Sequence, residues 1–216
     1  MSSSLDKLQR SWGEPSRLPI NGEAGAQLAA LVERIISQQR GVHTICDLGC
    51  GGGYLGSRLG SHGFKVTGID ASDTLLASAI EHHASDRVTF ARGVFGELDA
   101  IAPAGAFDLV VSVDVIEHLF QPTQLMRDAH RLLRRDGRLV LGTPYHGYLK
   151  NLAISLLGKW DSHHHVHFDG GHIKYFSVRT LSAMLEREGF EVERLHYFGR
   201  APGLWKNMIA VARKRE

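Results

Sequence analysis

The feature that most constrains this chain is a glycine-rich loop between an expected strand and an expected helix. The run DLGCGGGYLG, residues 47–56, follows the apolar segment 43–48 and leads into the helical pattern of residues 53–62. Glycine adopts positive φ without steric cost and lets a ligand approach the backbone closely. This order of elements is typical of a parallel α/β sheet that binds ligands beyond the carboxyl ends of its strands. The chain is therefore expected to be an α/β protein.

Apolar patterning along the rest of the chain alternates between strand and helix periods with short breaks, which supports this fold class. The expected strands are residues 43–48, 65–70, 87–91, 107–113, 138–143, 191–197 and 206–212. The expected helices are residues 24–39, 53–62, 73–84, 122–134, 148–157 and 178–189. Ser72 and Ser177 are expected N-caps, and an Asp136-Gly137 turn is expected to precede the fifth strand. Pro202 and Gly203 predict a turn that makes the last two strands an antiparallel hairpin.

Composition fits one domain over residues 1–216, with 43% hydrophobic and 22% charged residues. The 25 basic and 23 acidic residues give a net charge of +2, which is too balanced for an electrostatic nucleic-acid binder. The first residues, MSSSLDKLQRSW, lack the apolar core of a secretory signal, and no transmembrane segment is expected, so the predicted location is cytoplasmic. Cys46 and Cys50 are the only cysteines and are expected to be buried thiols without a disulfide.

An acidic residue after the next strand points to a nucleoside-bearing cofactor. Asp70 ends the strand 65–70 and stands 19 residues after Gly51, where a carboxylate can accept both hydroxyl protons of a ribose. The spacing Gly51-x-Gly53-x-x-Gly56 also matches a dinucleotide fingerprint. Asp47, however, would repel a pyrophosphate and would suit an ammonium group. Since no second domain is evident to hold a substrate against a nicotinamide, S-adenosylmethionine is favoured over NAD.

Five separated segments resemble class I S-adenosylmethionine-dependent methyltransferases over residues 40–212. They are DLGCGGGYLG, VTGID, FDLVVSVDVIEHL, RDGRLVLGTP and the closing hairpin. Residues 107–119 and 132–144 are most similar to the branch that contains ubiquinone-biosynthesis O-methyltransferases. The resemblance implies a Rossmann-like seven-stranded sheet of order 3-2-1-4-5-7-6 with strand 7 antiparallel and helices on both faces. It also implies a lid insert after strand 5.

The resemblance further implies which residues hold S-adenosylmethionine and its product, S-adenosylhomocysteine. Asp47 and the glycines would frame the methionine end, Asp70 would hold the ribose, and Ala71 would flank the adenine. The family often has an acidic residue near Val94, and its absence here suggests that backbone groups read the adenine edge. The complete expected cofactor-binding set is Asp47, Gly49, Cys50, Gly51, Asp70, Ala71, Gly93, Val94, Phe95 and Val113.

Methyl transfer from a sulfonium requires an aligned nucleophile and a group that removes its proton, and histidine suits that second task. The catalytic candidates lie after strands 107–113 and 138–143, and they are His118, His172, His146 and Glu117, with His118 and His172 leading. Asp114, Glu117 and His118 also form an acid-x-x-Glu-His run that resembles one associated with a divalent metal in some ubiquinone-pathway enzymes. The favoured alternative has no metal, and Glu117 and His118 then orient the loop or contact the substrate.

Residues 144–176 are long for a plain connection and predict a substrate lid. Its apolar helix, residues 148–157, fits either an apolar pocket or membrane-surface contact, or burial against the domain or a partner copy in a homodimer. His163, His165 and His167 would share one face of an extended chain and could bind a transition metal, although structural or solvated histidines are favoured. Residues 1–40 are expected to form an N-terminal cap over the cofactor.

The sequence therefore predicts an S-adenosylmethionine-dependent methyltransferase that acts on an oxygen of a small molecule. The balanced charge and apolar lid favour an aromatic or lipid-like acceptor over a polyanion. N- or C-methylation of a metabolite or modified peptide is the first alternative. A non-catalytic cofactor-binding module and an NAD-dependent oxidoreductase are the remaining alternatives.

Overall fold

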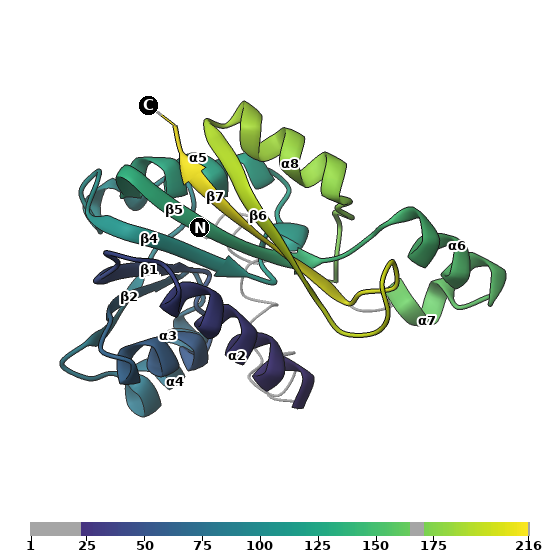
Figure 1. The fold of residues 1–216 in the computed structure, drawn as a ribbon. Helices are drawn as coiled ribbons and strands as arrows, with labels where there is room; N and C mark the ends of the chain where they lie inside the picture. The colour runs from purple at the N-terminus through teal and green to yellow at the C-terminus, as the bar shows by residue number, and fades with distance from the viewer. Residues whose placement is uncertain (1–22, 165–170, 216) are drawn as a thin grey trace, which may run out of the picture.

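The computed structural model describes residues 23–164 and 171–215, and a twisted seven-stranded sheet runs through its centre (Figure 1). The strand order is β3-β2-β1-β4-β5-β7-β6. β7 runs antiparallel to both β5 and β6, whereas β1 to β5 pair in parallel. The strands are β1 (Thr44–Leu48), β2 (Lys65–Asp70), β3 (Val88–Arg92), β4 (Phe107–Val113), β5 (Leu133–Pro144), β6 (Phe190–Phe198) and β7 (Asn207–Lys214). This topology confirms the expected fold class.

Helices cover both faces of the sheet because each has one apolar side to bury (Figure 1). Leu125 of α5 and Leu181 of α8 belong to the apolar core on one face. Val32 of α2 and Leu59 of α3 belong to the core on the other face. The helices are α2 (Glu23–Ser37), α3 (Tyr54–Ser61), α4 (Asp73–His83), α5 (Pro122–Leu132), α6 (Tyr148–Leu156), α7 (Trp160–His164) and α8 (Val178–Arg187), with short 3-10 turns η3 (Leu98–Ala100) and η4 (Ile116–His118).

Serine side chains start two of these helices, as the sequence predicts. Ser72 Oγ accepts a hydrogen bond from the Leu75 N–H at 3.3 Å at the start of α4. Ser177 and Thr180 form a reciprocal capping box at the start of α8. Both caps satisfy backbone donors that the first helical turn leaves without partners.

The fifth strand begins earlier than predicted. β5 starts at Leu133, so the Asp136-Gly137 turn lies inside the strand and not before it. Its register against β4 shifts between Phe107 and Leu109, and Asp136 adopts a φ of 60° within the irregular stretch. The local turn chemistry is as expected, but strand pairing on both sides of it makes one interrupted strand.

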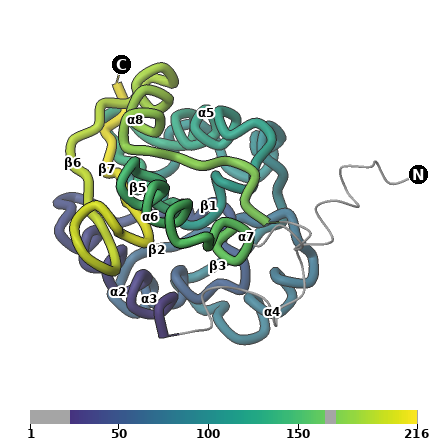
Figure 2. The backbone as a smooth tube through the Cα atoms, turned by 90° about the vertical axis from the view of Figure 1, so that its right-hand side faces the viewer, coloured from purple at the N-terminus to yellow at the C-terminus, as the bar shows by residue number. Residues whose placement is uncertain are grey.

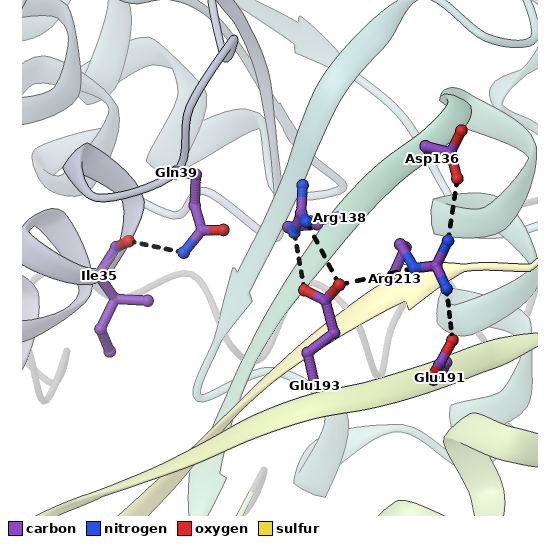
Figure 3. Close-up of polar contacts among 7 residues, drawn as sticks. All are labelled: Ile35, Gln39, Asp136, Arg138, Glu191, Glu193 and Arg213. Atoms are coloured by element: carbon purple, nitrogen blue, oxygen red, sulfur yellow. Dashed lines mark hydrogen bonds and ion pairs between the residues drawn. The ribbon is translucent and has the colours of Figure 1, made fainter.

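An ion network ties the antiparallel edge of the sheet to β5 (Figure 3). Arg138 Nε lies 2.7 Å from Glu193, and Arg213 contacts Glu191 at 2.6 Å, Asp136 at 3.1 Å and Glu193 at 3.5 Å. Because these side chains are exposed or partly exposed, solvent weakens each individual pair. Their shared arginine links three strands, so the network supports the register of β7. In the same figure the Gln39 side chain donates to the Ile35 carbonyl near the end of α2.

The segment after β5 extends beyond the carboxyl edge of the sheet as α6 and α7 (Figures 1 and 2). Much of its apolar surface is exposed, with Tyr148 at 79% and Leu156 at 78%. An extended chain, which would place His163, His165 and His167 on one face, is not found at His163. This residue lies in α7, and its N–H donates to the Lys159 carbonyl in a helical turn. His165 and His167 lie outside the described residues.

The structure bears in part on the predicted N-terminal cap and on the expected absence of a transmembrane segment. Residues 1–22 of the predicted N-terminal cap lie outside the described part of the chain, and from Glu23 onward α2 packs on the sheet. No helix within residues 23–164 and 171–215 is both long and apolar enough to cross a membrane.

Candidate active site

The glycine loop forms a tight turn between β1 and α3. Gly49 and Gly53 have φ values of 77° and 80°, which strain any residue with a side chain. A Cβ on Gly49 would stand 2.5 Å from a methyl group of Val115 in the turn after β4. The N–H groups of Gly49 and Cys50 both donate to the Ile69 carbonyl at 2.7 and 3.1 Å. These bonds hold the loop against the end of β2.

Asp70 joins the loop to the next strand. Its carboxylate accepts hydrogen bonds from the N–H groups of Gly51 and Ser72, each at 2.9 Å, and its carbonyl accepts one from Gly93. Burial raises the pKa of Asp70, and the backbone donors oppose that shift. The residue therefore stands where β1, β2 and the segment after β3 meet, as a ribose-binding carboxylate requires.

Asp47 provides an unpaired acceptor beneath the loop. The residue is 3% exposed, and its Oδ2 atom has no hydrogen-bond partner among residues 23–164 and 171–215. Burial, followed by the nearby Asp70 carboxylate, raises the pKa of Asp47 to about 7. A buried acceptor without a donor is costly, so this atom fits a ligand that brings a proton donor or a positive charge.

A second cluster forms after β4, where Glu117 and His118 in η4 meet His172. Thr143 Oγ1 donates to Glu117 Oε2 at 2.9 Å, whereas Glu117 Oε1 is buried and has no hydrogen-bond partner in the described part of the chain. His172 Nε2 lies 4.0 Å from Glu117 Oε1. The imidazole rings of His172 and His118 meet edge to face with centroids 4.8 Å apart. The 38% exposure of the His172 side chain leaves this cluster open to a ligand.

Backbone bonds hold the cluster together across a long sequence separation. The N–H groups of Ile173 and Lys174 donate to the Glu117 carbonyl at 2.9 and 3.0 Å. A ring nitrogen of His118 lies 3.3 Å from the Gly171 carbonyl. The structure thus brings three of the four catalytic candidates, His118, His172 and Glu117, into one cluster.

The alternative with a divalent metal names Asp114, Glu117 and His118, but among the described residues His172 takes the place of Asp114 in the group of possible ligands. Glu117, His118 and His172 each offer one ligand atom within 4.8 Å of the others, a spacing that can accommodate a divalent cation. Asp114 is instead held by Asn207, whose side-chain amide donates to Asp114 Oδ1 at 2.6 Å. Asp114 is three residues before Glu117 and still acts on its pKa, but its carboxylate is not among the ligand atoms that lie together in the structure.

The carboxyls of the partly buried Asp114 and the buried Glu117 have raised pKa values. Burial raises the pKa of Asp114 to about 6, and the Asn207 hydrogen bond opposes the shift. Burial and then the Asp114 carboxylate raise the pKa of Glu117 well above its usual range. Sequence reasoning missed Asn207, which lies 93 residues from Asp114, and no local pattern marks it.

The fourth candidate, His146, belongs to another group of side chains. It is 6% exposed and packs against Tyr175, with ring centroids 4.8 Å apart, and against His164 of α7 at 5.7 Å. Burial and then the Lys150 ammonium lower the pKa of His146 to about 4. The imidazole is therefore neutral at pH 7 and a weak base in this setting.

A hollow of about 530 Å³ lies at the other edge of the sheet, near the residues where β1 and β2 begin. It is lined by His43, Thr44, Gly63, Lys65, Asp86 and Arg87. Ligands of open α/β sheets bind at the carboxyl ends of the strands, so this hollow is separate from the candidate active site.

Comparison with known proteins agrees with this geometry. A methyltransferase-domain family matches residues 20–195. The chain belongs to the methyltransferase-domain family. Its family match and its fold agree in identifying a methyltransferase domain.

The chain is also similar to a curated relative and to solved structures. This methyltransferase is 35% identical over 116 residues to the ubiquinone biosynthesis O-methyltransferase of Caulobacter vibrioides, an alignment over 53% of this chain and 46% of the relative. The S-adenosylmethionine-dependent methyltransferase of Mesorhizobium loti superposes with a TM-score of 0.65 at 21% identity over 90% of this chain and 100% of that one. The [4+2]-cyclase SpnF superposes with a TM-score of 0.70 at 19% identity over 92% and 85%. The chain thus matches about half the length of its curated relative.

The residues of this methyltransferase fit S-adenosylmethionine at the glycine loop. The unpaired Asp47 Oδ2 suits the ammonium of the cofactor, and the space where Gly51 would carry a Cβ is open. Cys50 differs from the other predicted cofactor residues, because its Sγ lies 2.9 Å from where Gly68 of β2 would carry a Cβ. The Cys50 side chain therefore packs toward β2, and its N–H and carbonyl are already bonded to Ile69 and Gly53.

The remaining predicted cofactor residues lie along the same sheet edge. Ala71 follows Asp70 directly, and Val94 and Phe95 follow Gly93 after β3. Phe95 packs partly buried against the core, and Val113 at the end of β4 leans toward Gly142. Their roles toward the adenine stay predictions. Both cysteines are buried free thiols, as expected.

Proposed function

We propose that this chain transfers the methyl group of S-adenosylmethionine to a hydroxyl oxygen of a small aromatic molecule. One observation carries the proposal, namely the unpaired Glu117 Oε1 atom beside His172 Nε2 at 4.0 Å. A phenolic hydroxyl placed between them would meet one acceptor that takes its proton and one carboxyl that orients its oxygen. The similar ubiquinone biosynthesis O-methyltransferase supports an oxygen acceptor.

His172 is the proposed base, with His118 and Glu117 as its neighbours. S-adenosylmethionine supplies an activated methyl group on a sulfonium, so the protein has to align the acceptor and remove one proton. His172 becomes an imidazolium when it takes that proton. The new positive charge then favours the ionised form of Glu117, whose Oε1 lies 4.0 Å away and whose pKa burial otherwise raises. The edge-to-face ring of His118 limits the orientations that His172 can adopt.

The cluster also fits a divalent cation, which the resemblance presents as an alternative. Glu117, His118 and His172 would hold the ion, and the ion would lower the pKa of a bound hydroxyl. We assign the proton of the acceptor hydroxyl to His172, because an imidazole can take it without a bound cation. Of the predicted lid, α6 and α7 are proposed to cover the acceptor.

A labelled-methyl assay tests the proposal. Purified protein is incubated with methyl-labelled S-adenosylmethionine and matched phenols, amines and carbon acids, and products are identified by mass spectrometry. We expect methyl ethers from phenols. His172→Ala should lower kcat by about 100-fold or more, the usual scale for a lost general base, and leave the Kd of S-adenosylhomocysteine within about twofold.

His82→Ala is the matched control, since His82 is an exposed histidine on α4 with 61% of its side chain accessible. It should keep full activity. Methylation of nitrogen or carbon alone would overturn the oxygen assignment, and a wild-type rate in His172→Ala would overturn the base. The assay is needed because the fold alone does not define the reaction. The [4+2]-cyclase SpnF has a similar fold.

A further inference from the structure

Lys150 is a buried cation that the proposed reaction does not use. It lies in the first turn of α6 and is 4% exposed. Its Nζ donates to the Tyr145 carbonyl at 2.7 Å. Within residues 23–164 and 171–215, no carboxylate lies within ion-pair distance of this ammonium. A buried charge without a counter-charge is costly, so its retention points to a partner that arrives with a ligand.

The surroundings of Lys150 add positive charge. Burial and then the neighbouring Arg200 guanidinium lower the pKa of Lys150 to about 8, so the amine is still mostly protonated at pH 7. Arg200 lies in the β6–β7 turn with a φ of 47°, a left-handed conformation that is unusual for arginine. His146, which also faces Lys150, is neutral at pH 7 and does not offset this charge.

The amino end of α6 follows closely on the residue whose carbonyl binds the ammonium. Tyr145, whose carbonyl holds the ammonium, stands two residues before the helix N-cap, Gly147. Neither a side-chain cap nor an acidic residue satisfies the first turn of α6. A Cβ on Gly147 would collide with the Tyr145 hydroxyl, so the absent side chain lets this further donor approach. Free N–H groups and the helix dipole both favour an anion here.

This place is close to the proposed acceptor site. Tyr145 lies two residues after Thr143, whose hydroxyl binds Glu117. Tyr175, the ring neighbour of His146, donates its hydroxyl to the His172 carbonyl at 3.1 Å. Contacts between neighbouring residues therefore connect the cation with the proposed base.

We infer that Lys150, with Arg200 and the amino end of α6, binds a carboxylate carried by the methyl acceptor. The acceptor is then an aromatic acid whose hydroxyl reaches His172 while its carboxylate pairs with Lys150. This assignment rests on the proposed function for the identity of the ligand as the acceptor. It narrows the acceptor class from phenols in general to phenols with an acidic group.

Binding of a matched pair of probes tests the inference without turnover. We would titrate 4-methoxybenzoate and 4-methoxybenzamide into the full chain saturated with S-adenosylhomocysteine, which excludes the cofactor carboxylate as the bound anion. At pH 7 the benzoate should bind at least tenfold tighter than the amide. Lys150→Met keeps the apolar length of the side chain and should bring the two affinities within twofold. Lys159→Met, on an exposed lysine of the same lid, should keep the tenfold preference.

A pH series on the wild-type chain provides the test if Lys150→Met does not fold. The preference should fall at least threefold between pH 7 and pH 9.5 as Lys150 loses its proton, whereas His146 stays neutral and Arg200 stays charged. A preference below twofold at pH 7, including no binding of either probe, would overturn the inference. So would a preference that survives Lys150→Met. Since no methyl transfer is measured, these outcomes are separate from failure of the proposed reaction.

Discussion

Asn207 at the start of β7 donates its side-chain amide to Asp114 Oδ1 at 2.6 Å, across a sequence separation of 93 residues. Asp114 occupies the turn after β4 with a φ of 54°, and its N–H donates to the Gly142 carbonyl at 3.1 Å. The antiparallel hairpin thereby holds the turn that leads into Glu117 and His118. This contact links the edge of the sheet to the proposed acceptor site.

Replacing Asn207 should separate positioning from cofactor binding. Asn207→Leu keeps the size of the side chain but leaves the buried Asp114 carboxyl without its donor. We expect a loss of about 1–3 kcal/mol in unfolding free energy and at least a tenfold fall in kcat, with an unchanged Kd for S-adenosylhomocysteine. Denaturant unfolding, kinetics and calorimetric titration measure these quantities. Asn207→Gln, which keeps an amide, should recover part of the rate, and wild-type kcat in Asn207→Leu would contradict the positioning role.

Cofactor affinity should depend on pH through Asp47. Its pKa of about 7 means that the carboxyl is mostly protonated at pH 6, whereas the ammonium of the ligand stabilises only the ionised form. Binding must then release a proton, so affinity rises with pH up to about 7 and levels above it. Linkage predicts an increase of roughly eightfold between pH 6 and pH 7.5.

Titration calorimetry in buffers of different ionisation enthalpy measures that proton directly. At pH 6 the wild-type chain should release close to one proton on binding S-adenosylhomocysteine. Asp47→Asn should bind weakly and without this pH dependence. A wild-type affinity that stays constant from pH 6 to pH 7.5 would show that Asp47 does not meet the ammonium.

Chelation should leave the reaction intact if His172 is the base. We expect at least half of the wild-type rate after dialysis against EDTA, with no stimulation by added Mg²⁺, Mn²⁺ or Zn²⁺. Steady-state rates with a phenol acceptor measure this. A loss above 90% that one of these ions restores would assign Glu117, His118 and His172 to a cation instead.

The capping box of α8 should contribute to stability alone. Ser177→Ala removes the acceptor for the Thr180 N–H and should lower the free energy of unfolding by about 1 kcal/mol. Ser182→Ala, inside the same helix, is the control and should change stability little or raise it slightly. Denaturant unfolding of the two variants gives the comparison. Equal stability in both would mean that the cap contributes nothing.

The sequence by itself determined the elements whose signals are local. The glycine loop, the strand Lys65–Asp70 and the serine cap of α8 depend on residues a few positions apart. The fold class therefore follows from periodicity, whereas the order of the strands is implied by the family resemblance. The cofactor loop could be predicted in the same way, because strand, glycines and helix are consecutive in the chain.

Tertiary structure alone decided which side chains meet. His172 joins Glu117 and His118 because the segment before α8 bonds to the Glu117 carbonyl, and Asn207 reaches Asp114 because β7 lies beside β5. His146 and His163 fall into a separate group because α7 is helical. In the sequence, Lys150 is indistinguishable from an exposed lysine of a helix. Only the structure shows that its ammonium is buried and, among the described residues, has no carboxylate partner. Such contacts depend on long-range packing and desolvation, for which neighbouring residues in the chain carry no signal.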